Sequence, residues 1–431
     1  MGDIRLPHEL YTLDNGLRVI VHEDRRTPLV CVNVWYHVGS KEEVRGRTGF
    51  AHLFEHLMFE GSEHVPEGRF DELLEGIGGT NNGSTSTDRT NYWELMPSNG
   101  LDLALWLEAD RMGGLLPAIT GAQLEAQRDV VRNERRQSYE NRPYGLASET
   151  LTAALFPHGH PYSWPVIGSM NDIGAATIED VHAFCRQYYT PNNASIAVAG
   201  DVDVAHVRDV VERYFADIPA GPVVSRPEPA APALERTERI VMEDDVSLPR
   251  LYIAWHTPAV YEEGDAALDA AAAILAHGRA SRLYRTLVYD RQVAQAVSAY
   301  QSSAVLGSTF RIVVTARPDV ALTIIEREIR RELEAMANDV TDRELERAVN
   351  GIETGYIDSL QSVGGFGGRA DQLNMYLFHT GEPDYAARDL RRYQELTASD
   401  IARSVRDHLL APSVVLSVVP LGRSGLAAVN R

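Results

Sequence analysis

A proline- and alanine-rich segment divides this chain into two parts of similar size. The stretch "DIPAGPVVSRPEPAAPALERTE", from Asp217 to Glu238, has no apolar period and suits neither a core helix nor a strand. We interpret residues 219–236 as a semi-rigid linker with partly polyproline character. Because 431 residues exceed one ordinary domain, we expect two domains, residues 1–218 and 237–431.

The two halves share an order of predicted elements. In the first half, the strand-like "LRVIVHED" and "LVCVNVWYHV" precede a polar loop and an apolar helix. In the second half, "ERIVMEDD" and "PRLYIAWHTP" precede the loop "AVYEEGD" and the helix "AALDAAAAILAHG". Strands mixed with helices, repeated twice, predict an α+β protein with two homologous α/β-sandwich domains.

Two histidines and a glutamate interrupt the apolar helix of the first half. In "GFAHLFEHLMFEG", His52 and His56 lie four residues apart with Glu55 between them. Positions i and i+4 share one face of a helix, so both imidazoles can bind one zinc ion. Glu55 is placed to take a proton from a water on that ion. The alternative is a solvated or salt-bridged His-Glu-His helix, which the apolar neighbours disfavour. The corresponding helix of the second half has alanines instead.

A catalytic zinc ion usually has three protein ligands and one open position. The segment "QLEAQRDVVRNERRQSYENRPYG" offers three glutamates as the third ligand. They are Glu125, Glu134 and Glu140. Leu124, Val130 and Val131 predict an amphipathic helix that has Glu134 on or beside its inward face. Without further context, Glu134 is more readily interpreted as an ordinary acidic side chain on a helix surface.

These motifs together resemble the pitrilysin or insulinase family of metallopeptidases. "HLFEHLMFEG" is followed, 78 residues after His56, by the glutamate of "VVRNERRQSYENRPYG". The resemblance is to the smaller branch, with the mitochondrial processing peptidase and bacterial relatives. It continues through "TLDNGLRVIVHED", "GGTNNGSTSTDRTNYWELMP", "YYTPNNASIAVAGDVD" and "SRLYRTLVYDRQ". It implies two homologous domains that face each other as a clam shell. It also implies one Zn²⁺ per chain, bound by His52, His56 and Glu134, with Glu55 as the general base.

The segment "GGTNNGSTSTDRTNYWELMP" predicts a strand at the edge of a sheet. Gly-Gly and Asn-Asn-Gly predict a turn, and serine and threonine alternate after it. An exposed strand edge can accept an extended peptide as an added strand. The resembled family uses its corresponding strand in this way, which makes Asn82, Gly83, Ser84 and Thr85 candidate substrate-binding residues. The alternative is a plain polar hairpin.

Two positions depart from the family pattern. The family often has a supporting glutamate seven residues before the third ligand, where this chain has Gln127, which can still form a hydrogen bond near the site. Family members that are active without a partner chain also have an arginine and, seven residues later, a tyrosine that hold the substrate backbone. In "LVYDRQVAQAV" these positions are Val288 and Gln295. We therefore expect a heterodimer whose homologous partner supplies the arginine and tyrosine. The alternative is a homodimer in which neighbouring groups replace that pair: Tyr289, Arg291 or Tyr300.

Composition limits the partners and the compartment. The formal charge of −20 disfavours a nucleic-acid partner and favours basic peptides. No stretch approaches the ~20 apolar residues of a membrane span, and no signal peptide is visible. We expect a bacterial-type soluble protein of the cytoplasm or periplasm. Cys31 and Cys185 are too few for a disulfide framework, and we expect both to be buried.

The sequence thus predicts a zinc-dependent endopeptidase that hydrolyses extended oligopeptides and forms the zinc-binding subunit of a heterodimer. The competing hypothesis is a non-catalytic structural or assembly subunit of a larger complex. A third hypothesis is a metal-binding module without hydrolysis. The glycine-rich "SVGGFGGRADQLNMY" lacks the phosphate-loop pattern and predicts a flexible break between helices.

Overall fold

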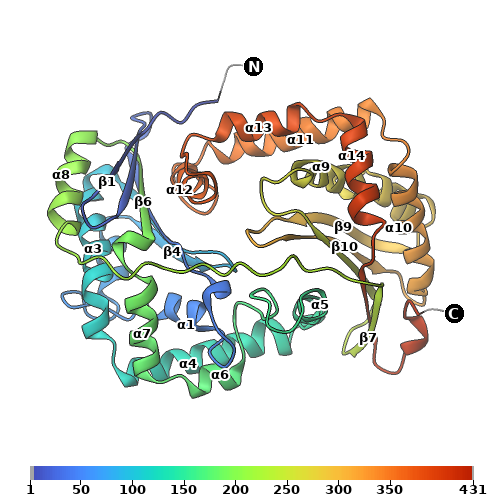
Figure 1. Ribbon diagram of the computed structural model, residues 1–431, viewed down its shortest axis with the longest axis horizontal. Helices are drawn as coiled ribbons and strands as arrows, with labels where there is room; N and C mark the ends of the chain where they lie inside the picture. The colour runs from blue at the N-terminus through green and yellow to red at the C-terminus, as the bar shows by residue number, and fades with distance from the viewer. Residues whose placement is uncertain (1–3, 430–431) are drawn as a thin grey trace. The chain divides into compact units, whose positions relative to one another are not determined.

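The computed structural model describes residues 4–429, which form two compact units (Figure 1). Unit 1 holds the chain up to Glu134, Trp164–Pro227 and Tyr356–Arg388, and unit 2 holds Arg135–Ser163, Glu228–Gly355 and the chain from Asp389 onward. Among the described residues, none of the helices combines the length and apolar character needed to cross a bilayer.

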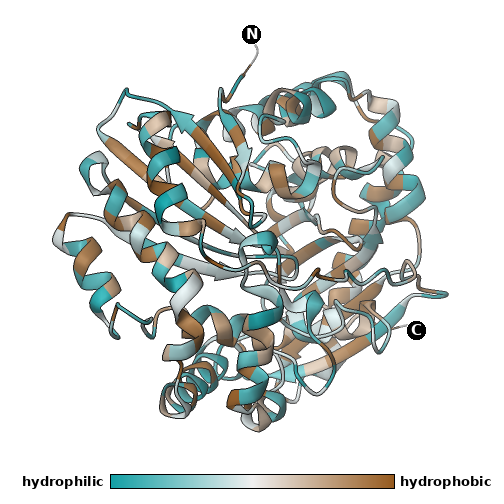
Figure 2. Cartoon of the chain, turned by 60° about the vertical axis from the view of Figure 1, so that its left-hand side comes forward, coloured by the Kyte–Doolittle hydropathy of each residue, from teal (hydrophilic) through white to brown (hydrophobic). Residues whose placement is uncertain are grey.

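Unit 1 is built on a six-stranded sheet with the order β1-β2-β6-β3-β5-β4. The strands are β1 (Glu9–Thr12), β2 (Arg18–Glu23), β6 (Ala194–Gly200), β3 (Leu29–Tyr36), β5 (Thr90–Pro97) and β4 (Thr80–Thr85). Only β2 and β6 pair in parallel, and the other neighbours are antiparallel. The strands β3 and β6 are buried along nearly their whole length, as expected for a sheet that is covered on both faces. Strands with hydrophobic residues are visible as brown ribbon in Figure 2.

Helices cover both faces of the unit 1 sheet. They are α1 (Phe50–Leu57), α2 (Arg69–Gly76), α3 (Leu101–Ala118), α4 (Gly121–Arg135), α6 (Met170–Ala175), α7 (Ile178–Tyr188), α8 (Val204–Phe215) and α12 (Arg369–Thr380). On one face, Asp371 of α12 accepts hydrogen bonds from Trp35 and Asn91. On the other face, the Tyr92 ring contacts Phe59, which follows α1. We call these the α12 face and the α1 face.

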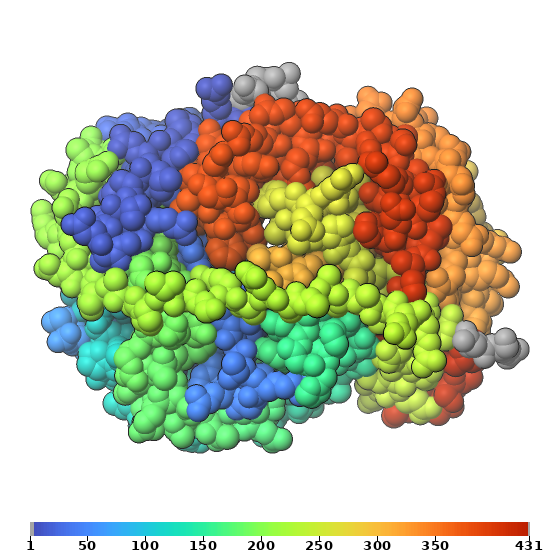
Figure 3. Space-filling view, viewed as in Figure 1, coloured from blue at the N-terminus to red at the C-terminus, as the bar shows by residue number. Residues whose placement is uncertain are grey.

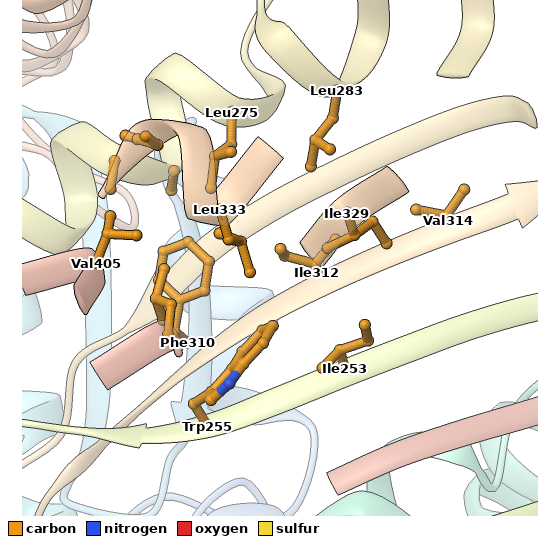
Figure 4. Close-up of a cluster of buried hydrophobic side chains, with 14 of the residues drawn as sticks. Ile253, Trp255, Leu275, Leu283, Phe310, Ile312, Val314, Ile329, Leu333 and Val405 are labelled. Atoms are coloured by element: carbon orange, nitrogen blue, oxygen red, sulfur yellow. The ribbon is translucent and has the colours of Figure 1, made fainter. Parts of the chain in front are cut away.

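Unit 2 is built on a five-stranded sheet with the order β7-β11-β8-β10-β9. The strands are β7 (Glu238–Asp244), β11 (Val414–Pro420), β8 (Arg250–Thr257), β10 (Ser308–Ala316) and β9 (Ala294–Ser302). Its helices, some of which continue into unit 1, are α5 (Ala147–Leu155), α9 (Asp265–Ala276), α10 (Leu322–Met336), α11 (Asp342–Ser359), α13 (Ala386–Gln394) and α14 (Ala398–Ser404). Figure 4 shows the core, in which Trp255 and Phe310 of the sheet pack with Ile329 and Leu333 of α10.

The two sheets confirm the predicted repeat. Without β1, the order β2-β6-β3-β5-β4 in unit 1 corresponds strand by strand to β7-β11-β8-β10-β9 in unit 2. In both sheets the first pair is parallel and the others are antiparallel. The corresponding helices α1 and α9 both follow a glycine in the left-handed region, Gly49 at φ 88° and Gly264 at φ 96°. The fold therefore consists of two similar α/β units.

The compact units are not contiguous along the sequence, unlike the predicted domains 1–218 and 237–431. The α12 segment packs on β3 and β6 of unit 1, where Figure 1 shows it in orange-red beside the blue and green strands. The α5 segment packs on β8 and β11 of unit 2. The physical reason is that each sheet needs helices on both faces, and the second layer comes from the other half of the sequence. Residues 219–234 have neither helix nor strand, and Figure 3 shows this segment as an extended run.

Candidate active site

Helix α1 presents the three motif residues on one side. Five of its eight residues are buried apolar side chains: Phe50, Ala51, Leu53, Phe54 and Leu57. The remaining three positions are His52, Glu55 and His56, and all three are partly buried. Because apolar burial fixes the rotation of this short helix, the motif residues must share its other side. The predicted helix and the common face of its two histidines are confirmed.

The start of α1 is held by a buried carboxylate that the sequence reasoning missed. Glu43 is 6% exposed, and its two oxygens accept hydrogen bonds from the backbone N–H groups of Gly49 (2.9 Å) and Ala51 (2.8 Å). Gly49 has no side chain that could cap the helix, so Glu43 satisfies donors that helix starts leave unpaired. Burial raises the pKa of Glu43 to about 8, and these two hydrogen bonds oppose that rise.

Glu134 lies on α4 and reaches the two histidines. Its Oε2 is 3.4 Å from Nε2 of His52 and 3.5 Å from Nε2 of His56. Buried Leu124 and Val131 fix the rotation of α4, as predicted, but Val130 is 43% exposed and the prediction that it belongs to the apolar face is wrong. The other two candidate glutamates point elsewhere: Glu125 pairs with Arg128 and Arg132, and Glu140 pairs with Arg135.

The donor atoms of this cluster fit a zinc ion. Two ligand atoms that each lie about 2.1 Å from a tetrahedral ion are about 3.4 Å apart, which matches both His–Glu134 separations. Burial lowers the pKa of His52 to about 4, so that its imidazole is in the neutral form that binds metals. The His56 imidazole holds the pKa of Glu134 below its usual range. Within the described residues, His52, His56 and Glu134 are the one group of acids, histidines or cysteines spaced for a metal.

Glu55 is oriented by the edge strand. The Thr85 hydroxyl donates a hydrogen bond to Oε2 of Glu55, 30 residues earlier in the chain. Burial raises the pKa of the Glu55 carboxyl, and the Thr85 hydrogen bond works against that rise. Thr85 was predicted only as a substrate-binding residue, so its contact with the candidate general base is a new feature.

The predicted edge strand is confirmed, because β4 is the last strand of its sheet. The predicted turn at Asn82 and Gly83 is wrong, because both residues lie inside β4, opposite Trp93 and Tyr92. Position 83 is a glycine because neighbouring rings pack closely against its backbone, and not because the chain turns there. A Cβ on Gly83 would lie 3.0 Å from the Tyr92 ring and 3.3 Å from the Phe59 ring.

The hydrogen-bond register of the hairpin decides which groups of β4 face outward. The Ser86 amide donates to the Arg89 carbonyl at 2.8 Å, and hydrogen-bonded pairs alternate from there. Ser84 is therefore bonded to Asn91 of β5, whereas the N–H and C=O groups of Gly83 and Thr85 face the open edge. The Gly83 amide donates to the Asn82 side-chain oxygen at 2.8 Å, so an extended peptide that pairs with β4 has to displace that amide side chain.

The remaining sequence candidates make contacts of their own. Gln127 donates a 2.6 Å hydrogen bond to Glu60, and no hydrogen bond joins it to a candidate ligand in the described part of the chain. In unit 2, Val288 packs against the core and Arg291 pairs with Glu328 at 3.0 Å. Tyr289 is 73% exposed.

Comparisons with known proteins identify the family. The family model described as Insulinase (Peptidase family M16) matches residues 18–165, and the model described as Peptidase M16 inactive domain matches residues 175–352. Zinc protease PqqE of Helicobacter pylori is 30% identical over 93% of this chain and 90% of its own length. This chain belongs to the M16 peptidase family.

Solved structures and a distant relative extend this M16 similarity. A protease from Helicobacter pylori matches this M16 chain with a TM-score of 0.89 and 28% identity over 97% of this chain and 100% of its own. A structure from Pseudomonas fluorescens, described as a peptidase M16 inactive domain, shares the fold at a TM-score of 0.84 and 21% identity, over 96% and 98% of the two chains. A probable mitochondrial-processing peptidase subunit beta of Arabidopsis thaliana is 23% identical over 95% of this chain and 77% of its own.

Proposed function

We propose that this M16 chain is a zinc-dependent endopeptidase that cleaves extended oligopeptides. The observation that carries the proposal is the convergence of His52, His56 and Glu134 at zinc-ligand spacing, with Glu55 on the same helix. Relatives named as zinc proteases support it. An intact ligand set with a candidate base also disfavours the alternative of a non-catalytic assembly subunit.

Each residue of the site has a role in this proposal. His52, His56 and Glu134 would hold the metal through Nε2, Nε2 and Oε2. When bound, zinc lowers the pKa of a coordinated water and polarises the scissile carbonyl. Glu55 takes a proton from the attacking water and returns it to the leaving amine as the C–N bond breaks. The outward backbone groups of Gly83 and Thr85 hold the peptide as an added strand.

We further propose that a homologous partner chain completes the substrate site. The C-terminal half has Val288 and Gln295 where self-sufficient relatives of the resembled family have an arginine and a tyrosine. Neither valine nor glutamine offers a charge that could hold a peptide carbonyl. The alternative, a homodimer that uses Tyr289, Arg291 or Tyr300, is less favoured because Arg291 is already paired with Glu328.

The test compares two variants that separate metal binding from proton transfer. We expect about one zinc per chain after reconstitution and loss of that zinc in Glu134→Ala, because three ligands are then reduced to two. Glu55→Gln should keep the zinc and lose about 10²- to 10⁴-fold in cleavage, because the amide cannot accept the proton. Peptide cleavage is followed by mass spectrometry, alone and with homologous partner chains.

Three results would contradict the proposal in different ways. Absence of zinc after reconstitution removes the metal site. Wild-type cleavage by Glu55→Gln removes Glu55 as the base. Bound zinc without cleavage of any peptide, with any partner, supports the metal-binding module instead.

A further inference from the structure

Arg89 is a cation without an anionic partner beside the candidate peptide-binding edge. It lies in the β4–β5 hairpin, partly buried, with Cζ 5.2 Å from the Trp35 ring centroid. Its Nη1 donates to the Ser84 carbonyl at 2.9 Å and to the Ser84 hydroxyl. Within residues 4–429, Arg89 forms no ion pair, and its Nε and Nη2 make no hydrogen bond. Burial lowers the pKa of this guanidinium, because water solvates its charge less well there.

The nearby carboxylates are occupied by other donors. Asp371 accepts hydrogen bonds from Trp35 Nε1 (2.8 Å), Asn91 Nδ2 (2.9 Å) and the Gly367 amide (2.8 Å). It therefore favours the charge of Arg89 only from a distance. The same contacts fix the surface beneath Arg89, because Asn91 also accepts the Ser84 hydroxyl at 2.6 Å.

The acidic groups Glu55 and Asp88 are engaged as well. Glu55 accepts the Thr85 hydroxyl on the α1 face, and Asp88 pairs with Lys41 at 3.6 Å. The guanidinium of Arg89 is thus held in place by neutral groups, and two of its nitrogens remain for another acceptor.

Strand geometry places one substrate side chain next to Arg89. Residues paired across neighbouring strands have their side chains on the same face, so Trp35, Asn91 and Ser84 share the α12 face. A peptide added to β4 continues this pattern. Its residue opposite Ser84 projects on the α12 face with its Cβ about 5 Å from that of Ser84. Arg89 already lies over Ser84, within reach of that side chain.

We propose that Arg89 selects an acidic side chain at the substrate residue that lies opposite Ser84. This inference rests on the proposed function, because it requires a peptide on β4. A glutamate or aspartate carboxylate there can accept from both unused nitrogens of the guanidinium, which is the strong bidentate geometry of arginine. The neighbouring substrate residues, opposite Gly83 and Thr85, project on the α1 face beside Glu55, so the acidic preference belongs to a single position.

The experiment measures this preference as a ratio. Zinc-loaded Glu55→Gln binds labelled peptides of about ten residues, an extended strand of ~33 Å. A single glutamate is moved through each position and compared with its glutamine twin by fluorescence anisotropy. We expect one position at which glutamate binds about tenfold tighter than glutamine, as for a charge-assisted hydrogen bond.

Variants assign the ratio to Arg89. We expect Arg89→Met to reduce it to about one and Arg89→Lys, which keeps the charge without the fork, to leave an intermediate ratio. Arg208→Met is the matched control. Arg208 also stacks on an aromatic ring, with Cζ 4.1 Å from the Tyr11 ring centroid, and its replacement by methionine removes the same charge. It should leave the ratio unchanged. A variant that merely loosens β4 weakens the glutamate and glutamine peptides equally and leaves their affinity ratio unchanged. A changed ratio therefore reports recognition of the carboxylate.

The outcomes separate this inference from the proposed function. A ratio near one at every position, when Glu55→Gln binds the peptides and the wild-type protein cleaves them, overturns the role of Arg89 and leaves the peptidase proposal intact. An acidic preference that Arg89→Met and Arg89→Lys both retain also overturns it. If no peptide binds at all, this inference and the proposal that β4 binds an extended peptide are both overturned.

Discussion

In the proposed mechanism, the contact between Thr85 and Glu55 links substrate binding to proton transfer at a single residue. Thr85 offers its backbone to the open edge of β4, while its hydroxyl holds Oε2 of Glu55. This leaves Oε1 as the oxygen of Glu55 available for proton transfer. A peptide that pairs with Thr85 would thereby lie next to the proposed base in a fixed orientation.

Replacement of Thr85 should therefore affect catalysis without removing the metal. In Thr85→Val the shape is kept and the hydroxyl is lost, and we expect about a tenfold lower kcat with zinc content unchanged. The Thr85 hydrogen bond lowers the pKa of Glu55. Without it that pKa rises, so the acidic limb of the pH–rate profile should move to higher pH.

The matched control is Thr85→Ser, which keeps the hydroxyl and should retain both the rate and the acidic limb. The measurement is a pH–rate profile with metal analysis of each variant. Identical profiles for the valine and serine variants would contradict the orienting role.

At the residue scale, the sequence predicts contacts within one helix and misses contacts between residues that are far apart in the sequence. The pairing of His52 and His56 follows from helix geometry alone, whereas Glu134 was singled out only through the resemblance. The Thr85–Glu55 bond joins a strand to a helix, and no periodicity encodes such a contact. The turn predicted at Gly83 failed because glycine is used there to admit the Tyr92 ring.

Among the elements, α1 is short and carries most of the candidate chemistry. An eight-residue helix is marginal by itself and depends on packing and capping. Its apolar side is packed, and Glu43 satisfies two of its first N–H groups. Glu43 lies six residues before Gly49, outside the usual capping positions, so the sequence pattern did not indicate it.

Removal of this carboxylate should weaken metal binding through the helix. We expect Glu43→Ala to lower the zinc affinity about tenfold and to reduce the free energy of unfolding by about 1–3 kcal/mol, because two buried N–H groups lose their acceptor. Competition with a chromophoric chelator measures the affinity, and thermal melts measure the stability.

A second capping residue of unit 1 provides the control. Asp203 caps α8, where its side chain accepts the His206 amide at 3.0 Å. Asp203→Ala should cost about 1 kcal/mol and leave the zinc affinity unchanged. Equal zinc affinities in the Glu43 and Asp203 variants would show that Glu43 only stabilises the fold.

On the scale of the whole chain, one layer of each unit comes from the other half of the sequence. Segment 356–388 supplies α12 to unit 1, and segment 135–163 supplies α5 to unit 2. The repeat predicted the two sheets correctly, because alternating strands are readable from local patterns. It could not predict the exchanged helices, since an amphipathic helix indicates that it packs but not on which sheet.

The proposed partner is tested with the whole chain. We expect slow turnover by this chain alone even with zinc bound, because no arginine and tyrosine from the second half add binding energy in the transition state. Addition of a homologous chain that has this pair but lacks H-x-x-E-H should raise turnover. The measurement is cleavage of a quenched fluorescent peptide during titration of the second chain. Full activity alone, unchanged by any second chain, would leave the heterodimer without support.

The exchanged segments decide how the protein should respond to a protease. Residues 219–234 form an extended run without helix or strand, the kind of segment that proteases cut first. The chain changes unit at residues 134, 163, 227, 355 and 388, so a single nick in this run leaves each fragment with a piece of both units. The two fragments should appear as separate bands on a denaturing gel and still elute together as one particle under native conditions. Separate expression of the two halves would likewise give each half a sheet with one bare face.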